Sequence, residues 1–452
     1  MNRKRKINLV KGMKDILPDE QNYWNLIKQK VDKIAYNYGF SRIDTPLVEF
    51  TDLFKRTVGE DTDIINKEMY SFITKGGDKL SLRPENTASI VRSYIEHGML
   101  NLSQPVKLYY FGQQFRHDNP QKGRYRQFWQ FGFETLGDND PIIDAQLIAV
   151  SYFILKELGL DIEIQINNIG DEESRKNYLK ILKQYYNNKK NSLCDICKKR
   201  LNKNTLRLLD CKNIKCQELV EDAPQTLDYL NEESRDNFMM VLEYLDELEI
   251  VYNLNTKIVR GLDYYNKTIW EIIEKDKGGK LLALGGGGRY DDLVSLLGGR
   301  EEVSAAGFAI GVERVIISLH KNKIEIPKIK KPDIYVAQLG LEARKEALKL
   351  FEYLRKENFR VIENMSKKGL RDQLDIANRK GVKYTLILGQ KEINNKTILV
   401  RDMESGVQEI LDINKIKKEI NKRLSKSVTR SVIKKVKKKK KIVKKKTKKT
   451  KK

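Results

Sequence analysis

The sequence predicts an α+β domain built on an antiparallel sheet, interrupted by a helical insertion and followed by a smaller α/β domain. Three observations lead to this fold class. Two aromatic-rich segments, 106–116 and 125–136, flank a loop containing Asn, Pro, Gly and Lys, which is typical of a long hairpin. Residues 172–254 combine helical periodicity with many charges. Residues 332–420 alternate between strand and helix patterns, as in a mainly parallel sheet covered by helices.

Apolar periodicity places the elements around the hairpin. One face of the first predicted helix collects Trp24, Ile27, Val31, Ile34 and Tyr38. In order, we expect a helix at 20–38, a strand at 42–50 interrupted by Pro46, a helix at 86–96, a helix at 141–158 and a strand at 161–167.

Beyond the insertion, glycines punctuate the pattern. We expect strands at 268–273 and 281–284, the glycine run 285–288, a helix at 290–297 and a further helix near Gly311. A Lys/Pro linker at 324–331 leads to the smaller domain. Its predicted elements are strands at 333–338, 360–363, 384–389 and 396–400, and helices at 342–357 and 370–380.

Charge is concentrated at one end of the 452-residue chain, whose formal net charge is +25. Residues 421–452 hold 18 Lys/Arg and no Asp/Glu, which leaves 25 − 18 = +7 for residues 1–420. So dense a Lys run predicts a disordered tail, either attracted to polyanions such as RNA or serving as a solubilising appendage. The predicted domains are therefore 1–325, 332–420 and the tail 421–452.

The apolar residues are too dispersed to predict a membrane segment. No run of about 18 apolar residues occurs, so we expect no membrane span. The basic start, Met1 to Lys6, is not followed by an apolar stretch and a small-residue cleavage site. We therefore expect a cytoplasmic protein.

All four cysteines lie within 23 residues, in the pattern C-x2-C-x13-C-x4-C. Such clustering suggests a zinc site more than disulfides in a cytoplasmic chain. The alternative is a set of small, partly buried residues packed among the helices of the insertion. The residues concerned are Cys194, Cys197, Cys211 and Cys216.

The phosphate-binding loops known from other folds are missing. There is no G-x-x-x-x-G-K-[ST], and the run 285–288 lacks Rossmann spacing. Residues 365–368 resemble the Lys-rich loop of class I aminoacyl-tRNA synthetases, but the His-x-Gly-His partner is missing. Arginines are a second means of gripping phosphate, although each alone is more often a salt-bridge partner. Those in strand-like or helix-start contexts are Arg83, Arg116, Arg260, Arg289 and Arg314.

Several of these segments together resemble class II aminoacyl-tRNA synthetases. Phe115-Arg116 with residues 124–128 is similar to motif 2 of that class, and residues 307–314 are similar to motif 3. The strand with Pro46 resembles motif 1, which in the class forms the dimer interface. The resemblance implies the expected antiparallel catalytic sheet and a homodimer.

Two further segments narrow the resemblance to the histidyl-tRNA synthetase family. Residues 260–265, Arg-Gly-Leu-Asp-Tyr-Tyr, and 287–291, Gly-Gly-Arg-Tyr-Asp, resemble the two signatures peculiar to it. Residues 82–85 and 11–15 fit the same family, and the resemblance extends over most of residues 8–420. It implies an ATP-dependent ligase that forms histidyl-adenylate and then charges tRNA(His), releasing pyrophosphate and AMP.

The resemblance also implies an ATP site. Arg116 would hold the α-phosphate and the histidine carboxylate, and Arg260 would approach that phosphate from the other side. Arg314 would contact the γ-phosphate and one face of adenine, with Phe128 on the other face. Mg²⁺ would bridge phosphate oxygens. Phosphoryl chemistry of this kind needs positioning and charge neutralisation more than a covalent nucleophile.

A histidine site is implied in the same way. Its residues are Glu85, Thr87 and Gln130 for the ammonium group, and Glu134, Tyr264 and Tyr265 around the side chain. A neutral imidazole offers one donor and one acceptor, so Glu134 would accept its N–H and the Tyr265 hydroxyl would donate to its bare nitrogen. Taken without the motifs, Glu134 would be a strand carboxylate paired with Arg126, and Tyr265 a core residue.

Contacts with tRNA are assigned to two regions. In the motif 2 loop, Gln121 and Arg124 would meet the acceptor end. The domain 332–420 resembles the family's anticodon-binding module. Four residues depart from the family pattern: Asn86 replaces a common glycine, Asp118-Asn119 replaces Glu-Arg, and Trp129 replaces a common histidine.

Two other functions fit parts of the sequence. One is the non-catalytic, histidine-sensing regulatory subunit of ATP phosphoribosyltransferase, which shares the catalytic-domain fold. The arginines and the extra α/β domain oppose it. The other is an RNA-binding protein that uses the Lys-rich tail and has lost catalysis.

Overall fold

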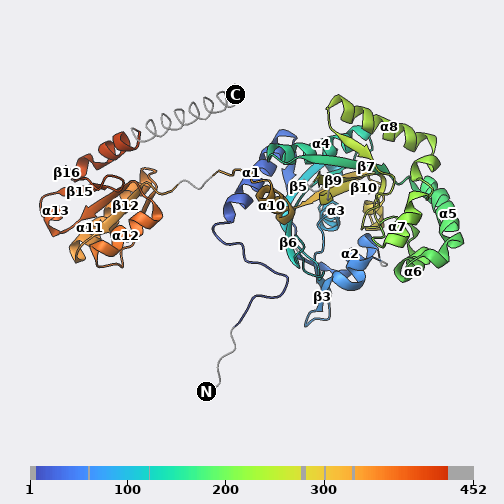
Figure 1. Cartoon of the computed structure of the whole chain (residues 1–452), viewed down its shortest axis with the longest axis horizontal. Helices are drawn as coiled ribbons and strands as arrows, with labels where there is room; N and C mark the ends of the chain where they lie inside the picture. Colours follow the sequence, from blue (N-terminus) through green and yellow to red (C-terminus); the bar gives the residue numbers. More distant parts are fainter. Residues whose placement is uncertain are drawn as a thin grey trace, which may run out of the picture. The chain divides into compact units, whose positions relative to one another are not determined.

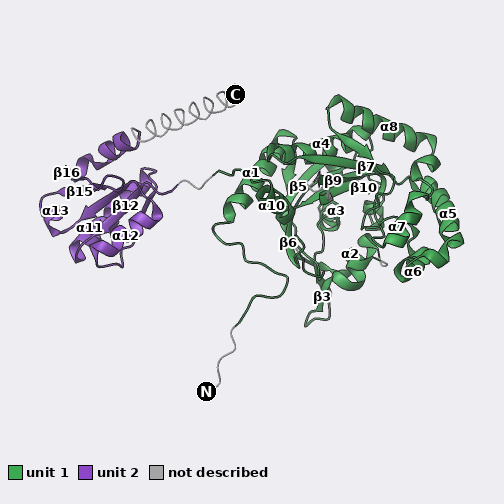
Figure 2. Cartoon of the chain, viewed as in Figure 1, with its two compact units in different colours: residues 1–327 green, residues 328–452 purple. Residues whose placement is uncertain are grey.

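The computed structural model describes residues 7–59, 62–121, 123–275, 281–299, 302–327 and 331–425. The chain divides into two compact units, Met1–Pro327 and Lys328–Lys452 (Figure 2). Most of the predicted tail, from residue 426 onward, lies outside the described residues. Within the described ranges, no helix is both long enough and apolar enough to cross a membrane.

The first unit is built on the predicted antiparallel sheet, which has eight strands (Figure 1). The two outermost strand pairs, β1–β5 and β7–β8, are parallel, and the pairs between them are antiparallel. In sheet order the strands are β1 (Ser41–Arg42), β5 (Val106–Phe115), β6 (Gln127–Leu136), β11 (Ala305–Gly311), β10 (Leu281–Arg289), β9 (Asn266–Lys275), β7 (Ile162–Asn168) and β8 (Tyr252–Leu254).

The hairpin β5–β6 confirms the strongest strand prediction. Its register runs without interruption from Val106↔Leu136 to Phe115↔Gln127. Helices α1 (Gln21–Asn37), α4 (Pro141–Glu157) and α10 (Val312–Lys321) contribute to one apolar core with β6, β7 and β11. The core includes Trp24, Ile27, Val31 and Ile34, the face expected for the first helix. The burial of these side chains stabilises the packing of the helices on the sheet.

The glycine run 285–288 lies inside strand β10 and does not follow it. The prediction of a strand ending at 284 is therefore wrong. The predicted helix 290–297 shrinks to α9 (Leu293–Leu296), and β11 was not expected. The physical reason is close packing: a Cβ on Gly286 would come within 2.4 Å of the Trp270 carbonyl oxygen and 2.6 Å of Arg260 Nη1. Glycine is needed here for the lack of a side chain, whereas sequence rules treat it as a strand breaker.

A second, three-stranded sheet carries the segment with Pro46. The predicted strand 42–50 is split, because β1 ends at Arg42 and β2 (Val48–Phe50) joins a different sheet. β2 pairs with β4 (Lys79–Leu82), which pairs with β3 (Tyr70–Ile73). Helices α2 (Thr51–Val58) and α3 (Thr87–Glu96) pack nearby; the predicted helix 86–96 corresponds to α3.

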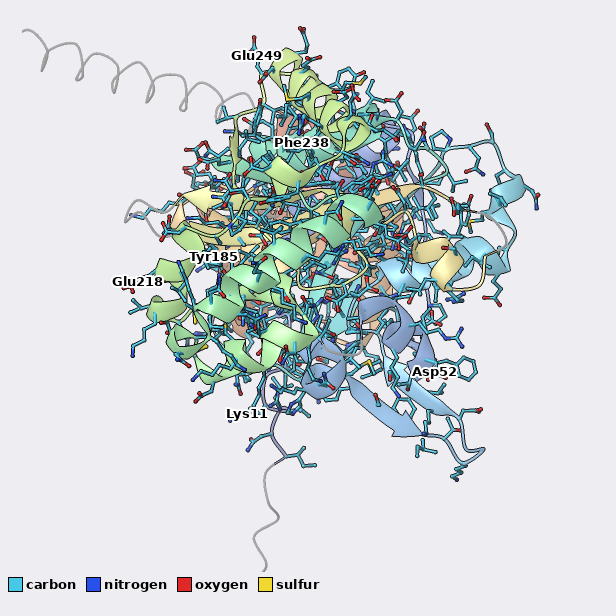
Figure 3. All side chains as sticks on the ribbon, turned by 90° about the vertical axis from the view of Figure 1, so that its right-hand side faces the viewer. Lys11, Asp52, Tyr185, Glu218, Phe238 and Glu249 are labelled. Carbon is cyan, nitrogen blue, oxygen red and sulfur yellow. The ribbon has the colours of Figure 1, made fainter. Side chains whose placement is uncertain are left out.

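The insertion is helical, as predicted. Its helices are α5 (Glu172–Asn188), α6 (Asp195–Lys203), α7 (Ile214–Glu221) and α8 (Glu232–Glu247). Helix α8 packs on α4 and joins the main core, whereas α5, α6 and α7 enclose a small core of their own. In Figure 3, Tyr185 and Glu218 lie on this smaller group of helices, where the Tyr185 hydroxyl donates to the Leu219 carbonyl at 2.7 Å.

The second unit has a five-stranded sheet in the order β13 (Val361–Glu363), β12 (Ile334–Gln338), β14 (Tyr384–Leu388), β15 (Thr397–Asp402) and β16 (Gln408–Asp412). Helices α11 (Leu341–Lys356) and α12 (Leu370–Lys380) match the prediction, and α13 (Gln390–Asn394) is additional. Only the first three strands are parallel, so the expected mainly parallel sheet is mixed. Residues 389–396 connect β14 to β15, and so short a connection cannot return the chain in parallel.

Candidate active site

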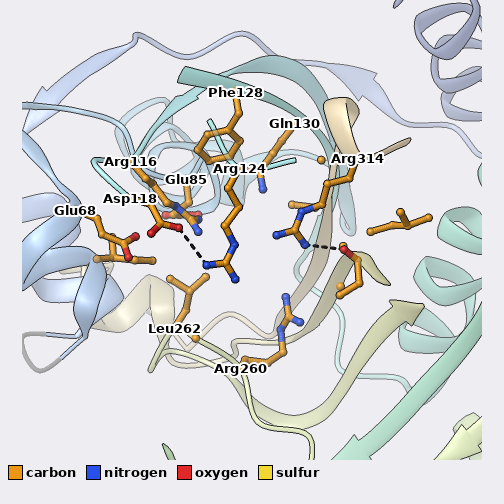
Figure 4. A pocket seen from close by; sticks show the side chains of 18 of the residues that line it. Glu68, Glu85, Arg116, Asp118, Arg124, Phe128, Gln130, Arg260, Leu262 and Arg314 are labelled. Carbon is orange, nitrogen blue, oxygen red and sulfur yellow. Dashed lines mark hydrogen bonds and ion pairs between the residues drawn. The ribbon is translucent and has the colours of Figure 1, made fainter. Parts of the chain in front are cut away.

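A cavity of about 470 Å³ opens over β10 in the first unit. The end of β5, the β5–β6 loop, the segment 260–265 and the start of α10 surround it, so residues distant in sequence meet there (Figure 4). The arginines that line it are Arg116, Arg124, Arg207, Arg260 and Arg314. So many guanidinium groups around one polar cavity make it suited to a polyanion.

Arg116 is held at the end of β5. Its Nε donates to the Pro84 carbonyl at 2.8 Å, and its guanidinium carbon lies 5.5 Å from the centre of the Phe128 ring. Both contacts fix the side chain while leaving its terminal nitrogens available to the cavity (Figure 4). The planar fork is therefore oriented before a ligand arrives.

Arg260 faces Arg116 from the opposite side of the cavity (Figure 4). Its Nη1 donates to Glu271 Oε1 at 2.8 Å, and its guanidinium lies 5.6 Å from the Tyr265 ring centre. Burial lowers the pKa of Arg260, but attraction to Tyr265 and Glu271 outweighs it and the net shift is upward. Its buried Nε has no hydrogen-bond partner among the described residues.

Arg314, in the first turn of α10, links two walls of the cavity. Its Nη1 donates to the Ala283 carbonyl at 2.6 Å, and its Nε to the Gly123 carbonyl at 3.5 Å. Burial lowers its pKa, and the neighbouring cations Arg124 and Arg116 lower it further. These cations repel one another, so a bound polyanion would relieve the repulsion.

The other end of the cavity is acidic and polar. Glu85 is buried and accepts hydrogen bonds from the backbone N–H groups of Thr87 at 2.7 Å and Ala88 at 2.9 Å, at the start of α3. Burial raises its pKa, and these hydrogen bonds oppose the rise. Gln130 Oε1 is buried without a partner among the described residues. Glu85 and Gln130 thus present acceptors where a cationic group would bind.

The two predicted imidazole ligands lie in different surroundings. Tyr265 lines the cavity together with Tyr264, and their ring centres are 4.6 Å apart. Glu134 lies behind the lining, where it accepts hydrogen bonds from the Thr87 hydroxyl at 2.8 Å and from the Tyr290 hydroxyl. Burial raises the pKa of Glu134 to about 8. A hydrogen-bond donor placed beside Glu134 would favour its ionised form and so oppose this rise in pKa.

Comparisons with known proteins identify the family of this chain. A sequence model described as histidyl-tRNA synthetase matches residues 12–315, and one described as an anticodon binding domain matches residues 316–423. The chain belongs to the histidyl-tRNA synthetase family. The first of these matches lies wholly within the first unit.

Individual relatives agree with this family over nearly the whole chain. A histidine–tRNA ligase from Dehalococcoides mccartyi is 42% identical over 411 residues, covering 91% of this chain and 98% of the relative. One from Fervidobacterium nodosum is 44% identical over 402 residues, covering 88% and 94%. The solved structure of the apo histidyl-tRNA synthetase from S. aureus has a TM-score of 0.77 at 34% identity, covering 92% of this chain and 100% of that one.

Most residues that the sequence assigns to a synthetase site line this one cavity. They are Glu85, Thr87, Arg116, Arg124, Phe128, Gln130, Arg260, Tyr264, Tyr265 and Arg314. Glu134 does not line it, and neither does Gln121, an exposed residue of the loop whose backbone pairs with that of Arg124.

Two arginines of the sequence-based set do not belong to the synthetase cavity. The Nε of Arg289 lies 2.9 Å from Asp144 Oδ1 in a buried ion pair, and Arg83 donates to the Thr45 and Gln113 carbonyls, both at 2.9 Å. Both are structural. The interpretation of Glu134 as a partner of Arg126 is also wrong, because Glu134 accepts from hydroxyl groups.

Several lining residues of the synthetase site were not assigned from the sequence. Arg207 comes from the insertion and also lies 4.0 Å from Asp63 Oδ2. Glu313 accepts the Trp129 backbone N–H at 3.0 Å, and burial raises its pKa to about 7. A signal existed only for Glu313, which stands in motif 3; nothing local in the sequence distinguishes Arg207.

Proposed function

We propose that this chain activates L-histidine with ATP and transfers the histidyl group to the 3′ end of tRNA(His), releasing AMP and pyrophosphate. One observation carries the proposal. Arg116, Arg260 and Arg314 come from three separate elements, yet they line one cavity whose opposite end holds Glu85. A triphosphate and an amino acid can therefore lie side by side, each facing complementary charge.

In the first step, a histidine carboxylate oxygen attacks the α-phosphorus, and the bond from that phosphorus to pyrophosphate breaks. Arg116 and Arg260, on opposite sides, stabilise the charge that develops on the α-phosphate. Arg314 holds the γ-phosphate, and adenine lies between Arg314 and Phe128. No protein nucleophile is needed, since positioning and charge neutralisation lower the barrier.

Mg²⁺ is expected with the triphosphate. Hard divalent cations prefer oxygen ligands, and the half-buried carboxylates of Glu68 and Glu271 line the cavity together with Asp118. Mg²⁺ usually takes only one or two protein carboxylates besides the substrate phosphates, and each of these residues offers such an oxygen ligand. When bound, Mg²⁺ would neutralise charge on the phosphate oxygens.

The amino acid is identified by its polar groups. Glu85, Thr87 and Gln130 accept or orient the ammonium group. The imidazole donates one N–H to Glu134 and accepts from Tyr265, with Tyr264 beside it. Bound histidine would compete for the Glu134 oxygen that now accepts from the Thr87 hydroxyl. An amino acid lacking both ring nitrogens would leave buried polar groups unpaired, which can reduce its use by ~10⁴ or more.

The second step requires tRNA. Residues 332–420 form a domain that binds the anticodon end, and catalytic residues 1–325 receive the acceptor end, with Gln121 and Arg124 of the loop in contact. We expect the chain to act in the cytoplasm, where tRNA is charged.

A homodimer is also proposed. Phe50 and Phe72 both pair with Leu80 in the three-stranded sheet, so they share one face, and their side chains are 63% and 46% exposed. Exposed apolar side chains grouped in this way are typical of an interface. Phe50 belongs to the strand that resembles motif 1, and Phe72 lies in β3 of the same sheet. Each copy would cover the apolar face of the other.

The regulatory-subunit alternative is less supported. The relatives named above are ligases, and the second unit matches an anticodon binding domain, which histidine sensing does not need. Charging of a tRNA(His) transcript with radiolabelled histidine tests the proposal. We expect ATP-dependent label at the 3′ end. A folded protein that binds histidine but transfers no label would support the regulatory subunit instead.

A further inference from the structure

The four cysteines of the insertion meet at one point. Cys194 lies just before α6 and Cys197 in its first turn, Cys211 precedes α7 and Cys216 lies within it. Their four sulfur atoms all lie within 4.8 Å of one another. Three of the side chains are buried, and only Cys194 is partly exposed. The C-x2-C pair and the C-x4-C pair thus come together in one cluster in the folded chain.

The spacing of the sulfur atoms fits a tetrahedral metal centre. A zinc ion bound to four thiolates at about 2.3 Å places the sulfurs about 3.8 Å apart. Cys194 Sγ and Cys211 Sγ are separated by 3.9 Å. A disulfide would need about 2 Å, and all four thiols are free in this structure. Packing of small residues, the sequence-based alternative, does not by itself require four sulfurs to converge.

The surroundings also suit a tetrathiolate centre, which carries two net negative charges. The Cys194 backbone N–H donates to Cys216 Sγ at 3.3 Å, the kind of hydrogen bond that supports a thiolate. Between Cys194 and Cys216 the chain has two acidic residues and seven basic ones, which are Lys198, Lys199, Arg200, Lys203, Arg207, Lys212 and Lys215. This excess of basic residues in the segment offsets the negative charge of a tetrathiolate centre.

A cross-link here would have a structural purpose. Helices α5, α6 and α7 share a small core separate from the main one, and small cores commonly need a metal or disulfide for stability. The segment between the two cysteine pairs also reaches the active site. Arg200 Nη2 lies 3.2 Å from Asp63 Oδ2, and Asn204 Nδ2 donates to Asp263 Oδ1 at 2.9 Å. Asp263 belongs to the segment that carries Tyr264 and Tyr265.

We infer that Cys194, Cys197, Cys211 and Cys216 bind one structural zinc ion, which holds α6 and the following turn against the wall of the active site. The ion is saturated by protein ligands and takes no part in histidine activation. This inference does not rest on the proposed function, because the cluster would bind metal whether or not the cavity is catalytic.

Metal analysis of the full-length protein, purified reduced and without chelators, tests the inference directly. We expect one zinc per chain. The Cys197→Ser/Cys211→Ser double variant should lose it, and the control Lys215→Ala, an exposed position inside the same segment, should retain it. Stoichiometric iron in place of zinc would overturn the assignment of zinc.

Because the chain has no other cysteines, thiol chemistry reports on this site alone. In the wild-type protein we expect all four thiols to resist modification until a strong chelator is added, and cobalt(II) to give the absorption of a tetrahedral thiolate complex. Trypsin should cut at Lys198, Lys199 or Lys203 only after chelation. These measurements do not depend on how well the double variant folds.

Two results would overturn the inference. One is metal-free, folded protein whose four thiols react at once without a chelator. The other is metal-free protein with fewer than four free thiols after denaturation without reductant, which would show a disulfide. Loss of zinc with unchanged ATP–pyrophosphate exchange would leave the proposed function intact, and a zinc-loaded protein without exchange would contradict only that function.

Discussion

Arg260 lies directly over Gly286 and is fixed there by its ion pair with Glu271. The Nη1–Oε1 distance is 2.8 Å, and a Cβ on Gly286 would approach Nη1 to 2.6 Å. The position of the Arg260 guanidinium therefore depends on glycine at position 286 of β10. Because Gly286 has no side chain, the Arg260 guanidinium can lie against the backbone of β10 in the wall of the cavity.

Replacing Arg260 by alanine removes one of the two cations that flank the α-phosphate. We expect histidine-dependent ATP–pyrophosphate exchange to fall by about 10²–10³-fold or more, the range for losing one preorganised charge donor. Dimerisation and the midpoint of thermal unfolding should change little. Lys257→Ala, which removes a cation paired with Glu221 outside the cavity, is the matched control and should keep full activity. Normal turnover in Arg260→Ala would show that this role is wrong.

Gly286→Ala tests the need for an open strand surface. The added methyl group would lie 2.6 Å from Arg260 Nη1 and 2.4 Å from the Trp270 carbonyl oxygen, so we expect about 1–3 kcal/mol of destabilisation and a large loss of exchange activity. Gly76→Ala is the control, because the nearest atom there lies 3.7 Å from the new Cβ. Equal activity and equal denaturation midpoints in the two variants would contradict the close packing.

The buried carboxyl of Glu134 predicts a pH-dependent stability. Its pKa rises from 4.5 to about 8 through burial, so between these values the folded protein keeps a proton that the unfolded chain releases. This contribution is complete below pH 4.5 and is lost as the pH rises through about 8. Glu134→Gln cannot ionise. The free energy of unfolding of this variant should therefore rise relative to that of the wild type as the pH increases from about 5 to about 9.

Chemical denaturation of both proteins across this range measures the difference. Asp144 and Glu313, whose pKa values are also raised by burial, are present in both and cancel. Parallel stability curves would mean that Glu134 is not buried as described.

The Lys-rich tail provides a separate prediction. Truncation after Ser425 removes 16 positive charges, and we expect charging at saturating tRNA to be unchanged. The KM for tRNA should rise, most strongly at low salt, because non-specific attraction to RNA is electrostatic. Loss of all charging on truncation would instead favour an RNA-binding protein whose essential part is the tail.

The sequence predicts most of this fold because the hairpin and helices have strong local patterns. The aromatic-rich segments 106–116 and 125–136 identify β5 and β6, and apolar periodicity identifies α1 and α4. It fails at residues 285–288, where the neighbouring strands β9 and β11 and, at Gly286, Arg260 leave no room for a Cβ. Such a contact between distant segments cannot be inferred from local propensity.

The site shows the same division. Arg116 and Arg314 stand in recognisable motifs and line the cavity, whereas Arg289, equally conspicuous in the sequence, pairs with Asp144. To distinguish the cavity arginines from Arg289, one must know which arginine forms an ion pair with a carboxylate in the folded chain. Arg207 could not be found at all, because only tertiary packing brings the insertion to the cavity.

ATP–pyrophosphate exchange, measured with each of the twenty amino acids separately, tests the central claim most directly. The arginine cavity, with Tyr265 in its lining and Glu134 behind the lining, predicts exchange with histidine and none above background with the others. Absence of exchange with histidine in folded protein, or stronger exchange with any other amino acid, would contradict the account.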